Sequence, residues 1–173
     1  SVVAHQVVRL TVPGVPDVYR GSEGLDLSLV DPDNRRPVDW AGLVRTLERT
    51  ERWLAARIAV LGGGAVGDLP EATEFDLPTR KLAVMRLLLA ARRRMPDLFV
   101  GGGYVPLSVS GIGAERAIAF ARTVGDGDPA MLTVALRRGI TEADEMRLQL
   151  PYELASGAYV DLLSGRRLGV TDG

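Results

Sequence analysis

The sequence predicts a chain of mixed class, in which an α/β segment is followed by an all-β segment. Three observations support this prediction. A strand-like run leads into a long loop rich in proline and glycine, two stretches then repeat apolar residues at helical spacing, and short apolar runs between turn sequences fill the rest of the chain. The change of pattern near Asp97 divides the chain into segments 1–97 and 98–173.

The composition is that of a folded protein with no general affinity for polyanions. Of 173 residues, 46% are hydrophobic and 25% charged, and the formal net charge is −1, so we expect no nucleic-acid partner. The chain has no cysteine, which excludes disulfides, thiolate metal sites and thiol catalysis. It has one histidine, His5. A lone histidine makes no site, so we interpret His5 as structural and expect neither a metal nor a cofactor.

The length and the start of the chain carry further expectations. A complete (β/α)8 barrel needs about 250 residues, so if a chain of 173 residues carries barrel motifs, it carries only part of a barrel. The chain has no apolar run of the roughly 20 residues that a membrane span needs, and its start lacks the features of a signal peptide. We therefore expect no membrane partner and a cytoplasmic location. Because the start is apolar and lacks a capping residue, we expect it to lie inside a structural element.

The first predicted element is a strand over Val7–Val12. This run is rich in β-branched residues and stops at the turn sequence Pro13-Gly14, which is typical of a buried strand. The stretch from Pro13 to Pro37 has several prolines and glycines with Asp, Asn and Ser between them. Loops of this length in compact domains are usually functional or disordered, so it is the first place to look for a site.

Two helices are predicted next. Asp39 is a candidate N-cap, and apolar residues from Trp40 to Leu61 recur at helical spacing until three glycines end the pattern. We assign Trp40 and Trp53 to packing. The second helix covers 78–94, with Pro96 after it, and we expect its last residues, Arg92 to Arg94, to be a solvated helix end that complements the helix dipole.

The remaining chain predicts a small antiparallel β-sandwich. Its short apolar runs lie 10 to 14 residues apart, roughly as in sandwiches. They cover Tyr104–Val109, Ala117–Arg122, Met131–Leu136, Met146–Leu150 and Tyr159–Leu163. The predicted turns between them lie at 111–113, 125–129 and 156–157.

A glycine pattern at Gly62, Gly64 and Gly67 has the spacing of a dinucleotide-binding loop. Such a loop needs a strand before it and a helix that starts at it, because the pyrophosphate binds at the helix N-terminus. Here a predicted helix precedes the glycines and a polar stretch with Pro70 follows. We therefore interpret the pattern as a helix end with a linker, and a nucleotide site as a weak alternative.

Two motifs in the predicted loop resemble one enzyme family. The first, Pro-Gly-x-Pro-Asp-x-Tyr-x-Gly, occupies 13–21, and the second, Asp-Pro-Asp-Asn-Arg-Arg-Pro-Val-Asp, occupies 31–39. Further similarity lies at 81–82, 96–99 and 161–166. The chain resembles the C-terminal portion of the maltooligosyl trehalose synthases, members of the α-amylase superfamily (glycoside hydrolase family 13), over nearly its whole length.

The resemblance implies a fold and an activity. It implies the last strand and helices of a TIM barrel, over 1–97, followed by a C-terminal β-domain over 98–173. The implied reaction converts the reducing-end α-1,4 bond of a maltooligosaccharide to an α,α-1,1 bond through a glycosyl-enzyme intermediate. The family's catalytic carboxylates lie upstream of the eighth barrel strand, so we expect no catalytic residue in this chain. The implied partners are an α-glucan substrate and the rest of the barrel.

The resemblance also implies that the loop after the eighth strand lines the sugar pocket. Its polar and aromatic side chains can hydrogen-bond to sugar hydroxyls or stack on a sugar ring. The candidate substrate-binding residues are Asp17, Tyr19, Glu23, Asp31, Asp33, Asn34, Arg35 and Arg36. Structural alternatives stay open for these residues. Arg35 and Arg36 could pair with Asp17, Glu23 or Asp39 to order the loop. Tyr19 could fill the top of the barrel.

The chain also departs from the family pattern. Arg20 and Ser22 stand where Gln and Thr are more common, Tyr159 replaces a frequent tryptophan, and the strand around Met146 lacks the usual one. These differences bear on individual sugar contacts. The alternative function is that of a catalytically inert glucan-binding or accessory fragment of an α-amylase-type protein.

Overall fold

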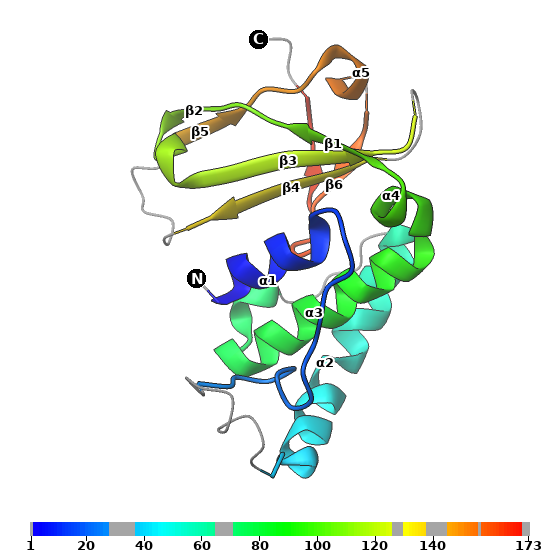
Figure 1. The fold of residues 1–173 in the computed structure, drawn as a ribbon, viewed down its shortest axis with the longest axis vertical. Coiled ribbons are helices and arrows are strands. Elements are labelled where there is room, and N and C mark those ends of the chain that lie inside the picture. The colour runs from blue at the N-terminus through cyan, green and yellow to red at the C-terminus, as the bar shows by residue number, and fades with distance from the viewer. Residues whose placement is uncertain are drawn as a thin grey trace.

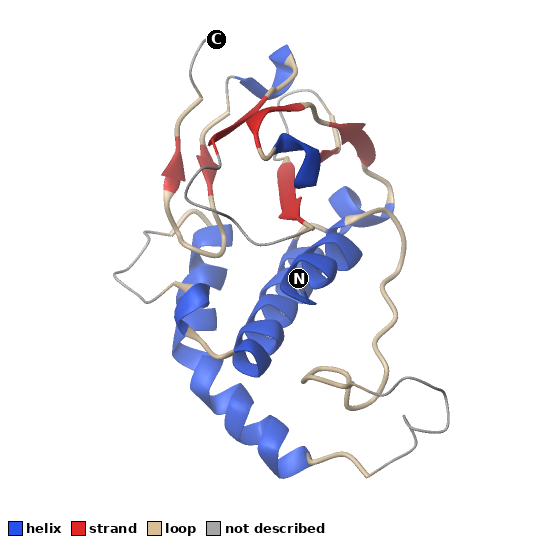
Figure 2. Ribbon diagram, turned by 90° about the vertical axis from the view of Figure 1, so that its left-hand side faces the viewer, coloured by secondary structure: helices blue, strands red, loops and turns tan. Residues whose placement is uncertain are grey.

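The computed structural model describes residues 2–27, 37–64, 71–125, 130–137, 145–155 and 157–170. Figure 1 shows the strands gathered in one half of the molecule and the long helices α2 and α3 in the other, with α1 between them. Figure 2, turned by 90°, shows the same division. The structure has helices first and antiparallel strands after them, as the predicted mixed class requires in outline. The described residues of the first segment, however, form only helices, so the α/β class predicted for 1–97 is not what this segment shows.

The predicted strand at Val7–Val12 is wrong, because this segment belongs to helix α1 (Val2–Thr11). Val3, Val7 and Leu10 recur at helical spacing and pack together against Leu82 and Val84 of α3 (Leu77–Arg94). The described strands pair antiparallel with one another. None of them is a parallel neighbour of the segment 7–12, as a barrel strand there would require. Burial of an apolar helix stripe thus outweighs the β preference of the valines.

The predictions for the two long helices are confirmed. Helix α2 (Trp40–Leu61) begins where the Asp39 carboxylate accepts a hydrogen bond from the Gly42 N–H at 2.8 Å, and it ends at Gly62. Helix α3 begins after a second aspartate cap, Asp76. Trp53 is buried between α2 and α3 as predicted, whereas Trp40 is 52% exposed and the prediction that it packs is wrong.

The β-part forms three small antiparallel sheets. The largest has the order β1 (Gly103–Pro106), β3 (Ala117–Thr123), β4 (Met131–Leu136), with Tyr104 opposite Arg122 and Phe120 opposite Thr133. The second pairs β2 (Val109–Ile112) with β5 (Glu145–Leu148), and the third pairs β6 (Tyr159–Val160) with β7 (Arg167–Leu168). The remaining short helices are η2 (Ala72–Glu74), α4 (Pro96–Val100), η3 (Ala114–Arg116) and α5 (Tyr152–Ala155).

Some predicted strand bounds and turns differ from these elements. The run Tyr104–Val109 is interrupted after Pro106, and the run Tyr159–Leu163 is a strand only at its first two residues. Gly111 and Ile112, predicted as a turn, lie in β2. Gly111 has a φ of 97°, a conformation open to glycine, and an added Cβ would meet the Glu145 carbonyl oxygen of β5 at 2.1 Å. The glycine there permits close strand pairing and does not mark a turn.

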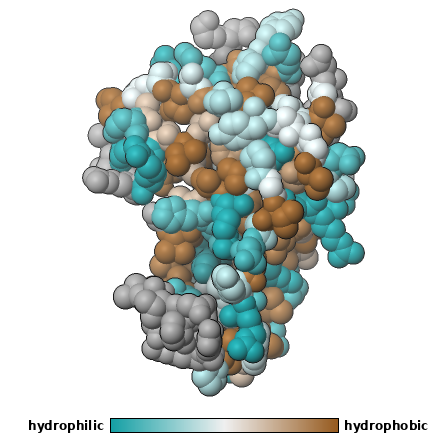
Figure 3. All heavy atoms as spheres, in the orientation of Figure 1, coloured by the Kyte–Doolittle hydropathy of each residue, from teal (hydrophilic) through white to brown (hydrophobic). Residues whose placement is uncertain are grey.

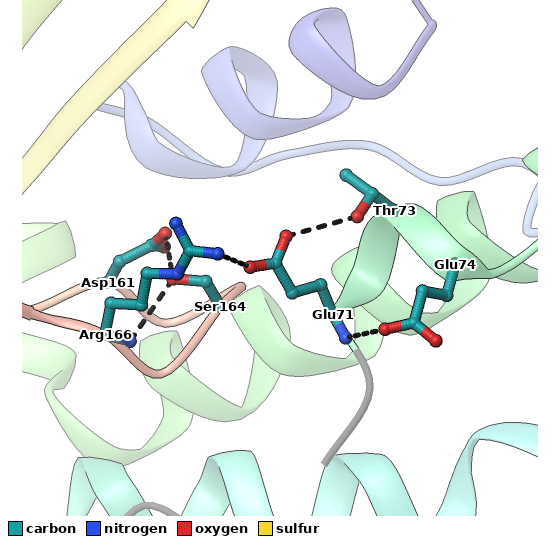
Figure 4. A network of polar contacts seen from close by, with 6 residues as sticks. All are labelled: Glu71, Thr73, Glu74, Asp161, Ser164 and Arg166. Carbon is teal, nitrogen blue, oxygen red and sulfur yellow. Dashed lines mark hydrogen bonds and ion pairs between the residues drawn. The ribbon is translucent and has the colours of Figure 1, made fainter. Parts of the chain in front are cut away.

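A turn between β6 and β7 connects the two halves of the molecule. It has the sequence Asp161-Leu-Leu-Ser-Gly-Arg166, and the Asp161 carboxylate accepts hydrogen bonds from the Leu163 N–H and the Ser164 hydroxyl. Leu162 and Leu163 pack into the hydrophobic clusters formed by α1, α2, α3 and α4. Arg166 reaches Glu71, just before η2, as Figure 4 shows. The C-terminal hairpin is thereby fixed to the helical part.

The surface is of mixed polarity. Figure 3 shows hydrophobic and polar residues side by side over both the strands and the helices of one face. Among the residues that the structure describes, no helix is both long and apolar enough to span a membrane.

Candidate functional site

The predicted site loop leaves the end of α1, whose terminal carbonyl groups are held by two arginines. Arg92 of α3 donates hydrogen bonds to the carbonyl oxygens of Leu10, at 3.0 Å, and Gly14, at 2.5 Å. Arg122 of β3 donates to that of Thr11 at 3.3 Å. Basic groups suit the unpaired carbonyls at a helix C-terminus. The first point of the loop is therefore fixed to α3.

Arg92 corrects one prediction from the sequence. Its guanidinium also lies over the Phe99 ring, 4.7 Å from the ring centroid. Burial and the neighbouring Arg122 lower the pKa of Arg92. Arg93 and Arg94 are exposed as predicted, but Arg92 is not part of a solvated helix end, because its side chain lies against the α1 terminus and α4.

The middle of the loop is a tight turn at Tyr19–Ser22. The Ser22 N–H and hydroxyl both donate to the Tyr19 carbonyl oxygen, at 3.0 and 2.7 Å. Gly21 has a φ of 86°, and a Cβ at this position would lie 2.8 Å from Cγ2 of Val38. Val38, which lies just before α2, is thus next to this turn.

Lys81 of α3 holds the next part of the loop. Its ammonium group donates to the carbonyl oxygen of Ser22 at 2.7 Å and to that of Gly24. The group is half-buried, and burial together with the positive charge of Arg9 lowers its pKa, against the opposing effect of Asp26 and Glu23. A cationic anchor with carboxylates beside it thus lies where α1, α3 and the loop meet.

The predicted site residues fall into two groups. Asp17 and Tyr19 are exposed, Tyr19 by 66%, on the stretch between the Arg92 and Lys81 anchors, and Glu23 is partly buried near Lys81. Oε2 of Glu23 is buried without a hydrogen-bond partner in the described part of the chain. The other five predicted residues lie outside the described residues: Asp31, Asp33, Asn34, Arg35 and Arg36.

The glycines at 62 and 63 terminate helix α2. The Gly62 N–H donates to the Ala59 carbonyl oxygen at 3.0 Å, and Gly63 adopts a φ of 80°, so both residues terminate the helix. Gly67 lies outside the described residues. Because a helix precedes the glycines where a strand is needed, the linker interpretation is supported.

A groove of about 370 Å³ lies between the end of α2 and the β6–β7 hairpin. It is lined mainly by small and apolar residues, among them Val60, Gly64 and Tyr159. The Tyr159 hydroxyl donates to the Leu154 carbonyl oxygen at 2.8 Å, and burial raises the pKa of this tyrosine. Within the described ranges, no cluster of three or more histidine or carboxylate residues could hold a metal ion.

Lys81 and Arg92 are functional candidates that the sequence analysis missed. A usable signal was present, since Lys81 is the only lysine of the chain and every other basic side chain except His5 is an arginine. The contacts that give these residues their importance join positions 57 to 82 residues apart, which no local pattern contains.

Comparison with known proteins identifies relatives of one kind, although no protein-family model matches the chain. The curated relatives are two proteins of Mycobacterium tuberculosis, from strains CDC 1551 and H37Rv, each described as a putative maltooligosyl trehalose synthase. Each is 36% identical over 166 residues, which is 94% of this chain. The chain spans 17% of the length of these relatives.

Solved structures agree with the curated relatives. The maltooligosyltrehalose synthase of Arthrobacter ramosus is 29% identical with a TM-score of 0.57, over 97% of this chain and 19% of its own. A second maltooligosyl trehalose synthase has a TM-score of 0.62 at 20% identity, over the same shares of the two chains, and supports the fold. The motifs at 13–21 and 31–39, from which the resemblance was inferred, thus led to the family that the comparisons find.

Proposed function

Since this chain corresponds to the C-terminal portion of the maltooligosyl trehalose synthases, we propose that it forms that portion of such an enzyme. The enzyme would convert the reducing-end α-1,4 bond of a maltooligosaccharide to the α,α-1,1 bond of a terminal trehalose unit, in trehalose biosynthesis. The observation that carries the proposal is the identity of 36% over nearly the whole chain. In this proposal the catalytic carboxylates belong to the part of the enzyme that precedes this chain.

The 13–27 loop is the proposed contribution of this chain to sugar binding. It carries the exposed Asp17 and Tyr19 between two anchor points on α3. A carboxylate accepts hydrogen bonds from sugar hydroxyls, and an exposed tyrosine ring can stack on a pyranose. Glu23 and the block Asp31, Asp33, Asn34, Arg35 and Arg36 complete the proposed set. A fixed loop loses less conformational freedom when sugar binds, which favours affinity.

The proposal assigns different roles to the two segments of the chain. Residues 1–97 would close the catalytic domain, and residues 98–173 would form a C-terminal β-domain held to it by the 161–166 turn and its two leucines. A cytoplasmic location is part of the proposal, because a chain without cysteine suits a reducing compartment.

A chimera tests this function. The matching C-terminal portion of the Arthrobacter ramosus synthase is replaced by this chain, and the conversion of maltopentaose is followed by the loss of reducing ends and by the appearance of a trehalose linkage. We expect conversion by the chimera. The truncated host protein is the control, and we expect it to be inactive without an added C-terminal portion.

Two substitutions locate the sugar contacts within the chimera. Tyr19→Ala and Asp17→Ala are each expected to raise KM for maltopentaose about tenfold, as the loss of one stacking or charged hydrogen-bond contact does. A chimera no more active than the truncated host contradicts the proposed function. An active chimera whose KM is unchanged by both substitutions contradicts the role of the loop alone.

A further inference from the structure

Lys81 differs in kind from the other basic residues that the structure describes. It is the only lysine of a chain that has 21 lysine and arginine residues in total. A lysine carries its charge on a compact ammonium group with three rotatable donors, whereas a guanidinium is larger and planar. In this structure the Lys81 ammonium group donates to two carbonyl groups of the loop, those of Ser22 and Gly24.

We propose that Lys81 is the positioning residue of the 13–27 loop, which it holds on α3 through the carbonyl groups of Ser22 and Gly24. The anchoring follows from these contacts, and its consequence for sugar binding rests on the proposed function. Lys81 touches the main chain of the loop, so its effect on the substrate is exerted through Tyr19 and Asp17.

The contacts of α3 bracket the exposed part of the loop. Arg92 follows Lys81 by eleven residues, about three helical turns, which brings both side chains to the same face of α3. Arg92 binds the Gly14 carbonyl oxygen before Tyr19, and Lys81 binds those of Ser22 and Gly24 after it. Figure 1 shows the loop descending from the end of α1 and passing across α3. Between the two anchors, Val18 packs on the cluster of α1 and α3.

The surroundings of Lys81 depend on its charge. Glu23 and Asp26 interact with the ammonium group, and Oε2 of Glu23 is buried. An apolar side chain in place of Lys81 leaves two carbonyl groups without their donor and the Glu23 carboxylate without its neighbouring cation, which favours exposure of the turn to water. Helix α3 keeps its Asp76 cap and its buried face, so we expect the helical core to remain folded.

Limited proteolysis of the 173-residue chain measures the anchoring. Arg20 is exposed within the loop, and trypsin cleavage after it releases the fragment 1–20, which mass spectrometry identifies. We expect Lys81→Met to be cleaved there at least about fivefold faster, the factor that corresponds to roughly 1 kcal/mol of lost local stability. Lys81→Arg is expected to be intermediate. Arg93→Met, which removes an exposed positive charge from the end of α3, is the matched control and is expected to leave the rate unchanged.

Hydrogen exchange distinguishes release of the loop from loss of the fold. Peptides from α2 and α3 are expected to exchange equally slowly in the Lys81→Met and unaltered chains, while peptides that contain 13–25 exchange faster. Equal cleavage rates at Arg20 in both chains overturn the proposal, and so does faster exchange in Lys81→Met that is the same in α2, α3 and the loop.

The chimera measures the consequence for sugar binding. Lys81→Met is expected to raise KM for maltopentaose at least about fivefold and to change kcat less than twofold, since only the binding geometry of the loop is altered. An unchanged KM with a released loop overturns the role in sugar binding. If the chimera with the unaltered chain is inactive, the proposed function fails, and the cleavage rates alone then decide the role of Lys81.

Discussion

The Arg166 guanidinium and the Glu71 carboxylate form an ion pair of 2.5 Å between the β6–β7 turn and the segment before η2. The Arg166 side chain is 75% exposed, and exposed pairs contribute about 0.2–1 kcal/mol. Leu163, three residues before Arg166 in the same turn, packs into two helical clusters. The attachment of the hairpin therefore depends more on its leucines than on its charges.

This difference can be measured by urea denaturation. We expect Arg166→Ala to lower the free energy of unfolding by less than about 1 kcal/mol and Leu163→Ala to lower it by about 2 kcal/mol, because the latter leaves a cavity. Ser164→Ala, which removes one hydrogen bond to Asp161, is the control within the same turn. A larger loss for Arg166→Ala than for Leu163→Ala would contradict the order of these contributions.

Arg122 is the second candidate for a large effect on stability. It is fully buried and donates hydrogen bonds to the carbonyl oxygens of Gly102, Gly103, Phe99 and Thr11. Arg122→Met removes the donor of all four acceptors, and the hydrogen bonds to Thr11 and Phe99 are buried, so we expect the free energy of unfolding to fall by about 3 kcal/mol. Arg147→Met removes an exposed arginine of β5 and is expected to change the stability by less than about 0.5 kcal/mol.

Asp76 predicts an acid dependence of stability. The hydroxyl and main-chain N–H of Thr79, which face its carboxylate, and the Arg49 guanidinium lower the pKa of Asp76 from 3.8 to about 2. Because the folded state holds the charged form, its contribution to stability is complete above pH 3.8 and is lost as the pH falls through 2.

The measurement compares urea unfolding of the unaltered chain and of Asp76→Asn at several pH values. Asparagine keeps a capping oxygen and cannot titrate, so the difference in stability between the two chains should shrink as the pH falls from 4 toward 2. Glu48→Gln on the exposed face of α2 serves as the control. A difference that does not vary with pH would be evidence against Asp76 as the titrating group.

Substitution of Gly21 is expected to lower the free energy of unfolding for two separable reasons. Its φ of 86° is strained for other residues, and an added Cβ would meet Val38 Cγ2 at 2.8 Å. We expect Gly21→Ala to destabilise the chain by about 1–3 kcal/mol. The double variant Gly21→Ala with Val38→Ala relieves only the steric contact, so the cost that remains measures the backbone strain. Gly101→Ala, where the nearest atom lies 3.8 Å from the new Cβ, is expected to be tolerated.

The sequence predicts the elements that local signals define. Helices α2 and α3 were found because an aspartate precedes the first and periodic apolar residues mark both. The segment 2–11 was mispredicted from Val7 onward, because a short valine-rich run fits a strand and a helix equally well. The contact of Val7 and Leu10 with α3 decides between them, and this contact is absent from any local window.

The candidate site was predictable in part. The exposure of Asp17 and Tyr19 agrees with the loop prediction, and the residues between 31 and 36 stay a prediction. The anchors Lys81 and Arg92 could not be derived from helix patterning, because their partners are main-chain oxygens of a distant loop. Only the singular use of lysine at position 81 marks one of them in the sequence.

The leucines of the 161–166 turn have a consequence for the order of folding. Leu162 and Leu163 contribute to clusters whose other members include Leu10, Trp53 and Leu98, which are translated much earlier. The helices can therefore form as the chain emerges from the ribosome, but their shared core stays incomplete until the turn has been synthesised. Contacts of such long sequence separation slow folding. We expect truncation before Asp161 to leave a helical part that binds hydrophobic dyes and aggregates.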